Sequence, residues 1–169
     1  ISDIARYQGD AIVAIAAQDE QTAQAALDAI QVEYEELPGV FDMLAALEPG
    51  AGRVWADKSN LCDQLVIERG DILAGFNKAD IIIENTYQTQ RVEHAFLETE
   101  CAVALVEDGS VIVYTCCQSP YRDRMQIARA LGIAQDRVRV ITPHIGGAFG
   151  GKDEAHVQIH AALLAYATG

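Results

Sequence analysis

The sequence predicts an α+β fold, and three observations lead to this prediction. Apolar residues recur at the 3.6-residue helical spacing in some segments, for example Asp19–Ile30. Short apolar runs bounded by turn residues, for example Cys101–Val106, are typical of strands. A stretch of weak periodicity around Pro49-Gly50-Ala51-Gly52 separates the pattern into two parts. We therefore expect two units, each containing helices and strands.

The N-terminal part is predicted to be β-α-β. Gly9–Ala17 is a glycine turn followed by a buried-type apolar run, which indicates a strand. Asp19–Ile30 has acidic residues in its first turn and an apolar face, which indicates an amphipathic helix. Gln31–Gly39 alternates apolar and charged residues before a Pro-Gly turn, so it is interpreted as a second strand.

The second part is predicted to mix helices and strands. Asp71–Ala79 is interpreted as a short helix, and three strands are expected at Ile81–Gln90, Cys101–Val106 and Val111–Thr115. The last two are separated by a turn that contains Asp108-Gly109, a strong hairpin signal, so they should pair antiparallel.

The C-terminal third adds two helices and a strand. Ser119 before Pro120 is typical of a helix N-cap, and Gly132 is typical of the end of that helix. Arg137–Ile141 is predicted to be a short strand, and the Ala-rich segment Asp153–Ala167 a helix.

Composition excludes several classes of partner. Half of the 169 residues are hydrophobic, which allows a sizeable core. Lys and Arg total 12 against 25 Asp and Glu, and the net charge of -13 argues against surfaces that bind nucleic acids or anionic membranes. The longest fully apolar run, Ala11–Ala17, is far shorter than the roughly 20 residues of a membrane-spanning helix. We expect no nucleic-acid partner and no membrane partner.

The cysteine and histidine spacings do not match a metal site. The four cysteines include no C-x-x-C pair and are Cys62, Cys101, Cys116 and Cys117. They are typical of reduced thiols, which predicts a cytoplasmic protein. His156 and His160 have helical i, i+4 spacing, but the Glu of H-E-x-x-H is missing, so we interpret both as structural.

The segment Gly146–Lys152, here called the glycine loop, reads GGAFGGK between a predicted strand and a predicted helix. A nucleotide-binding phosphate loop requires Ser or Thr after the lysine, and Asp153 stands in that place. Four glycines allow positive φ angles or a close backbone approach, and a following helix would direct free N–H groups and a positive dipole end at the loop. Such a loop suits an anionic group or a close backbone contact, and the alternative is a glycine-rich turn packed under a helix.

The glycine loop and the VRVI strand before it resemble the molybdenum-cofactor loop of the xanthine dehydrogenase and aldehyde oxidase family of molybdenum hydroxylases. Three further stretches resemble the same family in the same order: RYQGDAIVAIAA from Arg6 with VEYEELPGVFD from Val32, EHAFLETECAVA from Glu93, and TCCQSPYRDR from Thr115. Together these four matches cover nearly the whole chain.

The resemblance implies an internal fragment of the large, molybdopterin-binding subunit. Residues 1–45 would be the C-terminal part of an α/β-hammerhead domain, 46–63 a linker, and 64–169 the N-terminal part of a mixed α+β molybdopterin-binding domain. The absence of an initiator Met and an end at a predicted helix terminus agree with this expectation of a fragment.

The resemblance also implies an activity and cofactors. The family hydroxylates a carbon of an N-heterocycle or aldehyde with oxygen from water, using a molybdenum–molybdopterin cofactor. Electrons then pass to 2Fe-2S clusters and FAD in partner subunits or domains. The catalytic glutamate of the family lies beyond Gly169, so no catalytic residue is expected here, and the chain alone should be inactive and bind the cofactor weakly. Homo-oligomers are compatible with the sequence, since a fragment exposes apolar surface.

The resemblance assigns residues to the cofactor and the substrate. Gln118 falls on the glutamine that hydrogen-bonds an oxygen ligand of molybdenum, a role that suits an uncharged amide. The loop residues implied to bind the cofactor are Gly147, Phe149, Gly150 and Gly151, with Gly146 shaping the loop.

Asp153 falls where purine-oxidising members carry a glutamate that orients the substrate. Its side chain is one methylene shorter, which puts a purine substrate in doubt. Glu154 is the alternative substrate contact, although neighbouring residues on a helix point about 100° apart. Both could instead be an acidic first helical turn.

Two other functions remain open at this stage. One is a non-catalytic binding or scaffold domain that kept the fold, and the other is a phosphate-loop nucleotide binder.

Overall fold

The computed structural model describes residues 3–169. Their contacts divide into two compact units, the first joining Gly9–Ile30 to Arg91–Gly169 and the second consisting of Gln31–Gln90 with Arg6–Gln8. The domain boundaries predicted at residues 45 and 63 stay a prediction. The predicted α+β fold class is confirmed, because the first unit contains both helices and a mixed sheet.

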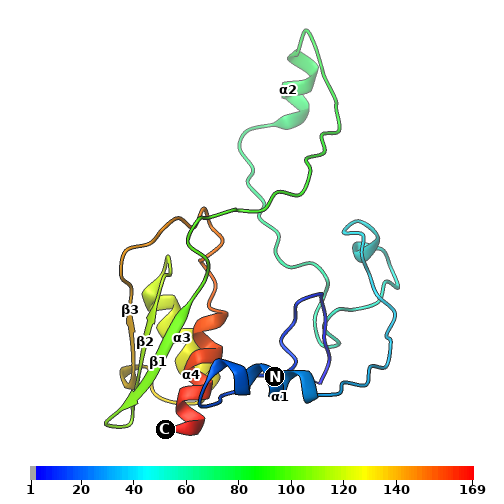
Figure 1. Cartoon of the computed structure of the whole chain (residues 1–169). Coiled ribbons are helices and arrows are strands. Elements are labelled where there is room, and N and C mark those ends of the chain that lie inside the picture. Colours follow the sequence, from blue (N-terminus) through cyan, green and yellow to red (C-terminus); the bar gives the residue numbers. More distant parts are fainter. Residues whose placement is uncertain (1–2) are drawn as a thin grey trace. The chain divides into compact units, whose positions relative to one another are not determined.

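The first unit is built on a three-stranded sheet in the order β1-β2-β3 (Figure 1). β1 (Ala102–Glu107) pairs antiparallel with β2 (Ser110–Thr115), and β2 pairs parallel with β3 (Val138–Ile141). Asp108 and Gly109 connect β1 to β2 with φ angles of 47° and 70°, as a type I′ hairpin turn requires. The predicted hairpin is confirmed.

Two helices cover one face of this sheet. α3 (Pro120–Leu131) packs on β3, and α4 (Val157–Thr168) packs on β1, β2 and α3. The buried core between them consists of Val111, Val113, Ile127, Ala128, Val138 and Ala162. β1 contributes alternate residues to this face and leaves Val103 and Leu105 exposed, as the two-residue period of a strand dictates.

The remaining helices begin one residue after the predicted first residues, which act as N-caps. α1 (Glu20–Ala29) begins after Asp19, whose carboxylate accepts the Thr22 N–H at 2.7 Å. α2 (Ile72–Lys78), in the second unit, begins after Asp71 in the same way. Short 3₁₀ turns occur at Ala45–Leu47 and Gln135–Arg137. No helix in the described part of the chain is long and apolar enough to cross a membrane.

Three predicted strands are wrong. Residues 9–17, 31–39 and 81–90 form no strand within the described residues. A strand exists through hydrogen bonds to a neighbour, and none of the described residues pairs with these segments. The apolar side chains of Ile81 and Ile83 are 78% and 79% exposed, so the apolar residues of this segment do not pack against a neighbouring element.

One predicted helix start is confirmed without its predicted capping bond, and another is wrong. Ser119 precedes α3, but its side chain makes no capping hydrogen bond. α4 begins at Val157 instead of Asp153, because Lys152 is held by Gln118, and the His156 N–H is capped by the Gln158 side chain at 2.9 Å. Asp153 and Glu154 are therefore not in the first turn of α4. Contrary to the prediction, the N-terminus of α4 also does not directly follow the glycine loop.

Candidate functional site

The glycine loop lies between β3 and α4 and turns sharply on itself. The Gly151 N–H donates to the Ala148 carbonyl at 2.8 Å, which closes a tight turn. Gly147, Phe149 and Gly150 have φ angles of 100°, 52° and 94°. Positive φ is ordinary for glycine and uncommon for phenylalanine, so Phe149 is held in a strained conformation with its ring 77% exposed.

Gln118 is bound to the end of this loop by two hydrogen bonds. The Gln118 N–H donates to the Lys152 carbonyl at 3.1 Å, and the Lys152 N–H donates to Gln118 Oε1 at 3.3 Å. Because an N–H needs an acceptor, this second bond fixes which end of the amide faces the loop. The Nε2 donor of Gln118 has no acceptor among the described residues.

The loop also presents backbone donors. Within the described residues, no acceptor is found for the N–H groups of the four residues 147–150. Buried backbone donors are nearly always paired, whereas these belong to a partly exposed segment in which only Ala148 is buried. The loop and Gln118 together therefore offer several uncharged hydrogen-bond donors to a bound group.

Two glycines are explained by the segment packed beneath the loop. A Cβ on Gly146 would lie 2.6 Å from Cβ of Glu98, and one on Gly151 would lie 2.7 Å from the Phe96 ring and 3.0 Å from His94. Real Cβ atoms do not approach so closely, so only glycine fits at these two positions. Gly150 has no comparable neighbour, and its positive φ is what requires glycine there.

Glu98 and Lys152 form an ion pair under the loop. Lys152 is fully buried, and its Nζ lies 2.9 Å from Glu98 Oε2 and 4.7 Å from the centre of the Phe96 ring. The same carboxylate accepts the Gly146 N–H at 2.7 Å. The Gly146 N–H and then Lys152 lower the pKa of Glu98. Burial acts to lower the pKa of Lys152, but the hydrogen bond to Glu98 and the interactions with Cys116 together outweigh burial and raise that pKa.

This burial contradicts the phosphate-loop alternative. The lysine of such a loop must reach the phosphates of the nucleotide. Here Nζ of Lys152 is enclosed by Glu98 and Phe96, and its charge is already neutralised.

Asp153 and Glu154 lie outside α4 and turn toward α3. Arg122 Nη1 is 2.6 Å from Asp153 Oδ2 and 4.0 Å from Glu154 Oε1. The amide of Gln126 also approaches Glu154, at 3.4 Å. Both carboxylates remain about half exposed, so each is accessible to a ligand while its position is set by α3.

The first unit also contains a buried carboxyl, on α3. Asp123 of α3 is fully buried, and neither of its carboxylate oxygens makes a hydrogen bond of standard geometry among the described residues, although the Cys117 thiol is close enough to interact with it. Burial raises its pKa, with Asp153 and Glu154 adding to the effect and the Cys117 thiol opposing it. The Cys117 Sγ lies 3.2 Å from Thr142 Oγ1, and burial raises the pKa of this thiol.

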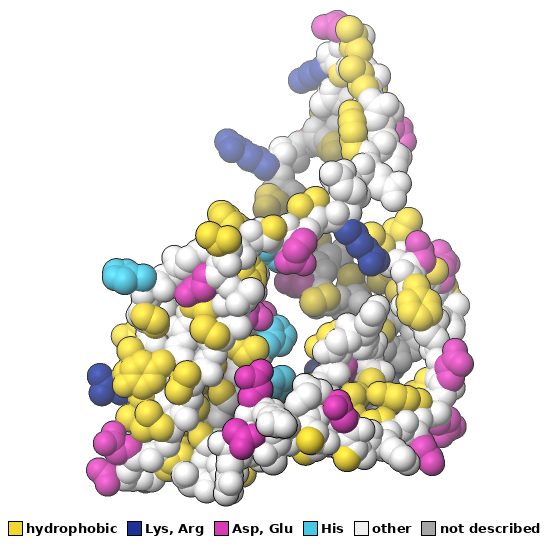
Figure 2. Space-filling model, in the orientation of Figure 1, with side chains coloured by type: hydrophobic (Ala, Val, Ile, Leu, Met, Phe, Trp, Pro, Cys, Tyr) yellow, Lys and Arg dark blue, Asp and Glu magenta, His cyan; other side chains and the backbone are white. Residues whose placement is uncertain are grey.

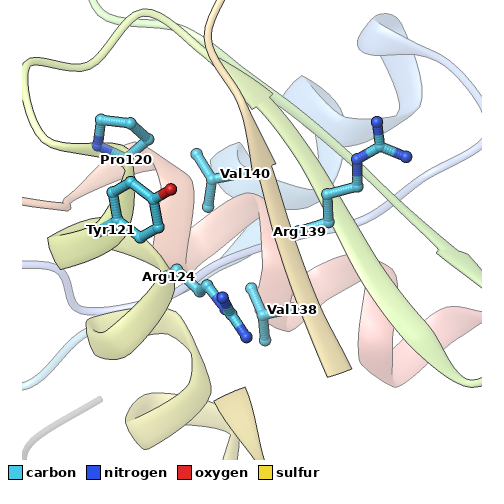
Figure 3. A pocket seen from close by; sticks show the side chains of 6 residues that line it. All are labelled: Pro120, Tyr121, Arg124, Val138, Arg139 and Val140. Carbon is cyan, nitrogen blue, oxygen red and sulfur yellow. The ribbon is translucent and has the colours of Figure 1, made fainter. Parts of the chain in front are cut away.

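A pocket of about 240 Å³ lies elsewhere, between the start of α3 and β3 (Figure 3). Pro120, Tyr121 and the two β3 valines make most of its wall, and Arg139 extends away from Pro120 and Tyr121. The pocket contains no acid, base or nucleophile of the predicted site. In the described part of the chain, no group of three or more His, Cys, Asp and Glu side chains could hold a metal ion.

The structure thus brings Gln118 and the glycine loop together, and it places Asp153 and Glu154 directly after the loop. The role of Glu98 was not predicted from the sequence. Its partner Lys152 is 54 residues away. The only sign of this ion pair in the sequence is a lysine next to the loop glycines, and it does not indicate which residue pairs with the lysine.

Comparison with known proteins identifies the family. Residues 55–169 match the family model of the molybdopterin cofactor-binding domain. The chain is 43% identical over 168 residues to a probable xanthine dehydrogenase subunit of Bacillus subtilis (strain 168), covering 99% of this chain and 22% of that protein. It is 41% identical over 169 residues to the nicotinate dehydrogenase large molybdopterin subunit of Eubacterium barkeri, covering 99% of this chain and 40% of that protein.

Solved structures agree with the sequence comparison. The aldehyde oxidoreductase of Desulfovibrio gigas matches with a TM-score of 0.81 at 26% identity, over 90% of this chain and 17% of that one. Quinoline 2-oxidoreductase of Pseudomonas putida 86 matches with a TM-score of 0.69 at 31% identity, over 89% of this chain and 20% of that one. The chain therefore spans 17% to 40% of the length of these relatives. It belongs to the molybdopterin cofactor-binding domain family of xanthine dehydrogenase and aldehyde oxidoreductase large subunits.

Proposed function

We propose that this chain forms part of the cofactor site of a molybdenum hydroxylase that hydroxylates a carbon of an N-heterocycle or aldehyde, with water as the oxygen source. The observation that carries the proposal is the pair of hydrogen bonds between Gln118 and Lys152. These bonds place the free Nε2 donor of Gln118 at the end of a loop whose amides at 147–150 are also free among the described residues.

The donors of this chain fit an oxygen-rich, anionic cofactor. Amide N–H groups and a carboxamide can donate to oxygen atoms without adding charge, and Gly150 allows the backbone to approach a bound group closely. In the proposal, Gln118, Gly147, Phe149, Gly150 and Gly151 contact the cofactor. The molybdenum–molybdopterin group would supply the two-electron redox chemistry when bound, and the chain would supply position and hydrogen bonds.

Asp153 and Glu154 are proposed to face the substrate. Arg122 holds Asp153 at 2.6 Å, so a substrate that needs this carboxylate must share it with the guanidinium. The identity of the relatives, one a xanthine dehydrogenase subunit and the other a nicotinate dehydrogenase subunit, supports a nitrogen heterocycle as the substrate class. The proposal also includes partner subunits or domains that carry 2Fe-2S clusters and FAD. It keeps the predicted domain boundaries, with a hammerhead part at 1–45, a linker at 46–63 and a molybdopterin-binding part at 64–169.

The first test is metal analysis of the protein produced from its complete gene, in a host that makes the cofactor. About one molybdenum per chain, with turnover of a purine, another heterocycle or an aldehyde by an artificial electron acceptor, is expected. A protein without molybdenum from such a host would support the scaffold alternative instead.

The role of Gln118 is tested by Gln118→Glu. The carboxylate can still accept the Lys152 N–H, so the variant removes the Nε2 donor and adds a negative charge. We expect molybdenum content or turnover to fall by about tenfold or more, since the loss of one preorganised donor commonly costs that much. Gln135→Glu, at an exposed position in the 3₁₀ turn that follows α3, is the matched control and should leave both unchanged.

A further inference from the structure

Glu98 contacts both ends of the glycine loop. Its Oε2 accepts the N–H of Gly146, the first residue of the loop, at 2.7 Å. The same oxygen lies 2.9 Å from Nζ of Lys152, the last residue of the loop. In addition, the Glu98 N–H donates to the Gly146 carbonyl at 3.3 Å. One residue from a distant segment therefore closes the loop.

Lys152 transmits this restraint to Gln118. The side chain of Lys152 is bound by Glu98, and its backbone N–H and carbonyl are both bound by Gln118. Because Lys152 is fully buried and packs over the Phe96 ring, it has no room for another arrangement. The position of the Gln118 amide thus depends on the Glu98–Lys152 pair.

The packing under the loop has the same effect. Gly146 and Gly151 approach the segment that contains Phe96 and Glu98 more closely than a residue with a Cβ could. The loop is held against this segment at both of its ends, and the amides without an acceptor among the described residues lie between the two points of contact.

We propose that Glu98 is a positioning residue which, through Gly146 and Lys152, fixes the glycine loop and Gln118 in the geometry that binds the cofactor. This inference rests on the proposed function. Glu98 itself contacts neither the amides of residues 147–150 nor the Gln118 donor, so its effect passes through the loop.

A pair of variants separates positioning from stability. Glu98→Gln removes the charge that balances buried Lys152, and the loss of one partner of a buried pair is strongly destabilising. The double variant Glu98→Gln/Lys152→Met leaves no unpaired charge, and replacing a buried pair by neutral groups of similar size is often nearly neutral for stability. The carboxamide introduced by Glu98→Gln can still accept the Gly146 N–H. The double variant therefore removes only the interaction between the side chains at positions 98 and 152.

The experiment uses the protein from its complete gene and measures melting temperature, molybdenum per folded chain, and hydrogen exchange of the Gly151 and Lys152 amides. The expected result is a double variant that melts close to the wild type. Its molybdenum content should fall by about tenfold or more, as seen when outer-shell partners of a metal site are removed. The amides at positions 151 and 152 should lose about tenfold of their protection, after correction for the intrinsic exchange rate of Met at position 152, because the loop opens locally.

Arg137→Met is the matched control. Arg137 also joins two segments of the first unit, with its guanidinium 2.6 Å from the Gly109 carbonyl, but it does not contact the glycine loop. It should leave molybdenum content and the exchange of the two loop amides at wild-type values.

Two results would overturn the inference. One is a double variant with wild-type molybdenum content and wild-type protection of the amides at positions 151 and 152. The other is a double variant that melts as low as Glu98→Gln, which would show that the pair acts on stability alone. If the wild type itself contains no molybdenum, the proposed function fails, while the exchange measurement still tests whether Glu98 holds the loop.

Discussion

The carboxylate of Asp123 is fully buried and makes no hydrogen bond of standard geometry in the described part of the chain, with the Cys117 thiol as a weak neighbour. Burial disfavours the charged form and raises the pKa of Asp123. A carboxyl whose folded pKa is raised lowers the stability of the protein as pH rises through that pKa, whereas below its ordinary value of 3.8 it carries no such cost. At neutral pH the buried Asp123 carboxyl therefore lowers the stability of the folded protein.

We predict that Asp123→Asn stabilises the protein at neutral pH by about 1–3 kcal/mol, because the amide carries no charge and so avoids the cost of burying an ionised carboxylate. The advantage should shrink as pH is lowered toward 4, because the wild-type carboxyl then becomes neutral. Urea unfolding of both proteins at several pH values measures this difference. Asp136→Asn, at an exposed position, should change stability by less than about 0.5 kcal/mol at every pH. A pH-independent difference for Asp123→Asn would contradict the argument.

Residues with a local signature were predictable from the sequence. Gln118 and the glycine loop belong to contiguous motifs, and the structure brings them together. Glu98 was not predictable as a partner of Lys152, because 54 residues separate them and the contact arises only when the chain folds. Asp123 could not be recognised either, since its helical position between two arginines is equally typical of a solvated face.

At the scale of elements, the hairpin between β1 and β2 depends on its turn. Gly109 has φ of 70°, and a Cβ there would collide with the Arg137 guanidinium. Gly109→Ala should therefore destabilise the first unit by about 1–2 kcal/mol, the cost of a left-handed conformation for a residue with a side chain. Asp108→Asn should be nearly neutral, because Asn tolerates the left-handed region well. Urea unfolding followed by circular dichroism distinguishes the two, and equal stability of both variants would contradict this account.

The elements show which patterns suffice for prediction. α1, α2, the β1–β2 hairpin and the end of α3 at Gly132 follow from capping and turn residues within a few positions. The three strands that do not form were predicted from apolar patterning alone. Patterning describes the surface that a strand would present, but its hydrogen bonds come from a neighbour that no local pattern specifies.

At the scale of the whole molecule, strong negative charge coexists with much exposed apolar surface. The net charge is -13, and the exposed large hydrophobic side chains include a run in the second unit at Ile81, Ile82 and Ile83. Figure 2 shows acidic and hydrophobic side chains interspersed on the visible face. Charge repulsion keeps copies of such a chain apart, while contacts between apolar side chains favour association.

We predict that the 169-residue chain self-associates as pH falls from 7 toward its isoelectric point near 4.5, and that added salt promotes association at pH 7 by screening the repulsion. Sedimentation velocity measures the change in mass. Ile82→Lys should reduce association, whereas Gln88→Lys alters the net charge equally without removing an apolar side chain and should reduce it less. If both variants behave alike, charge alone controls association. If the wild type stays monomeric at pH 5 and in high salt, the exposed apolar side chains do not act as contacts between copies.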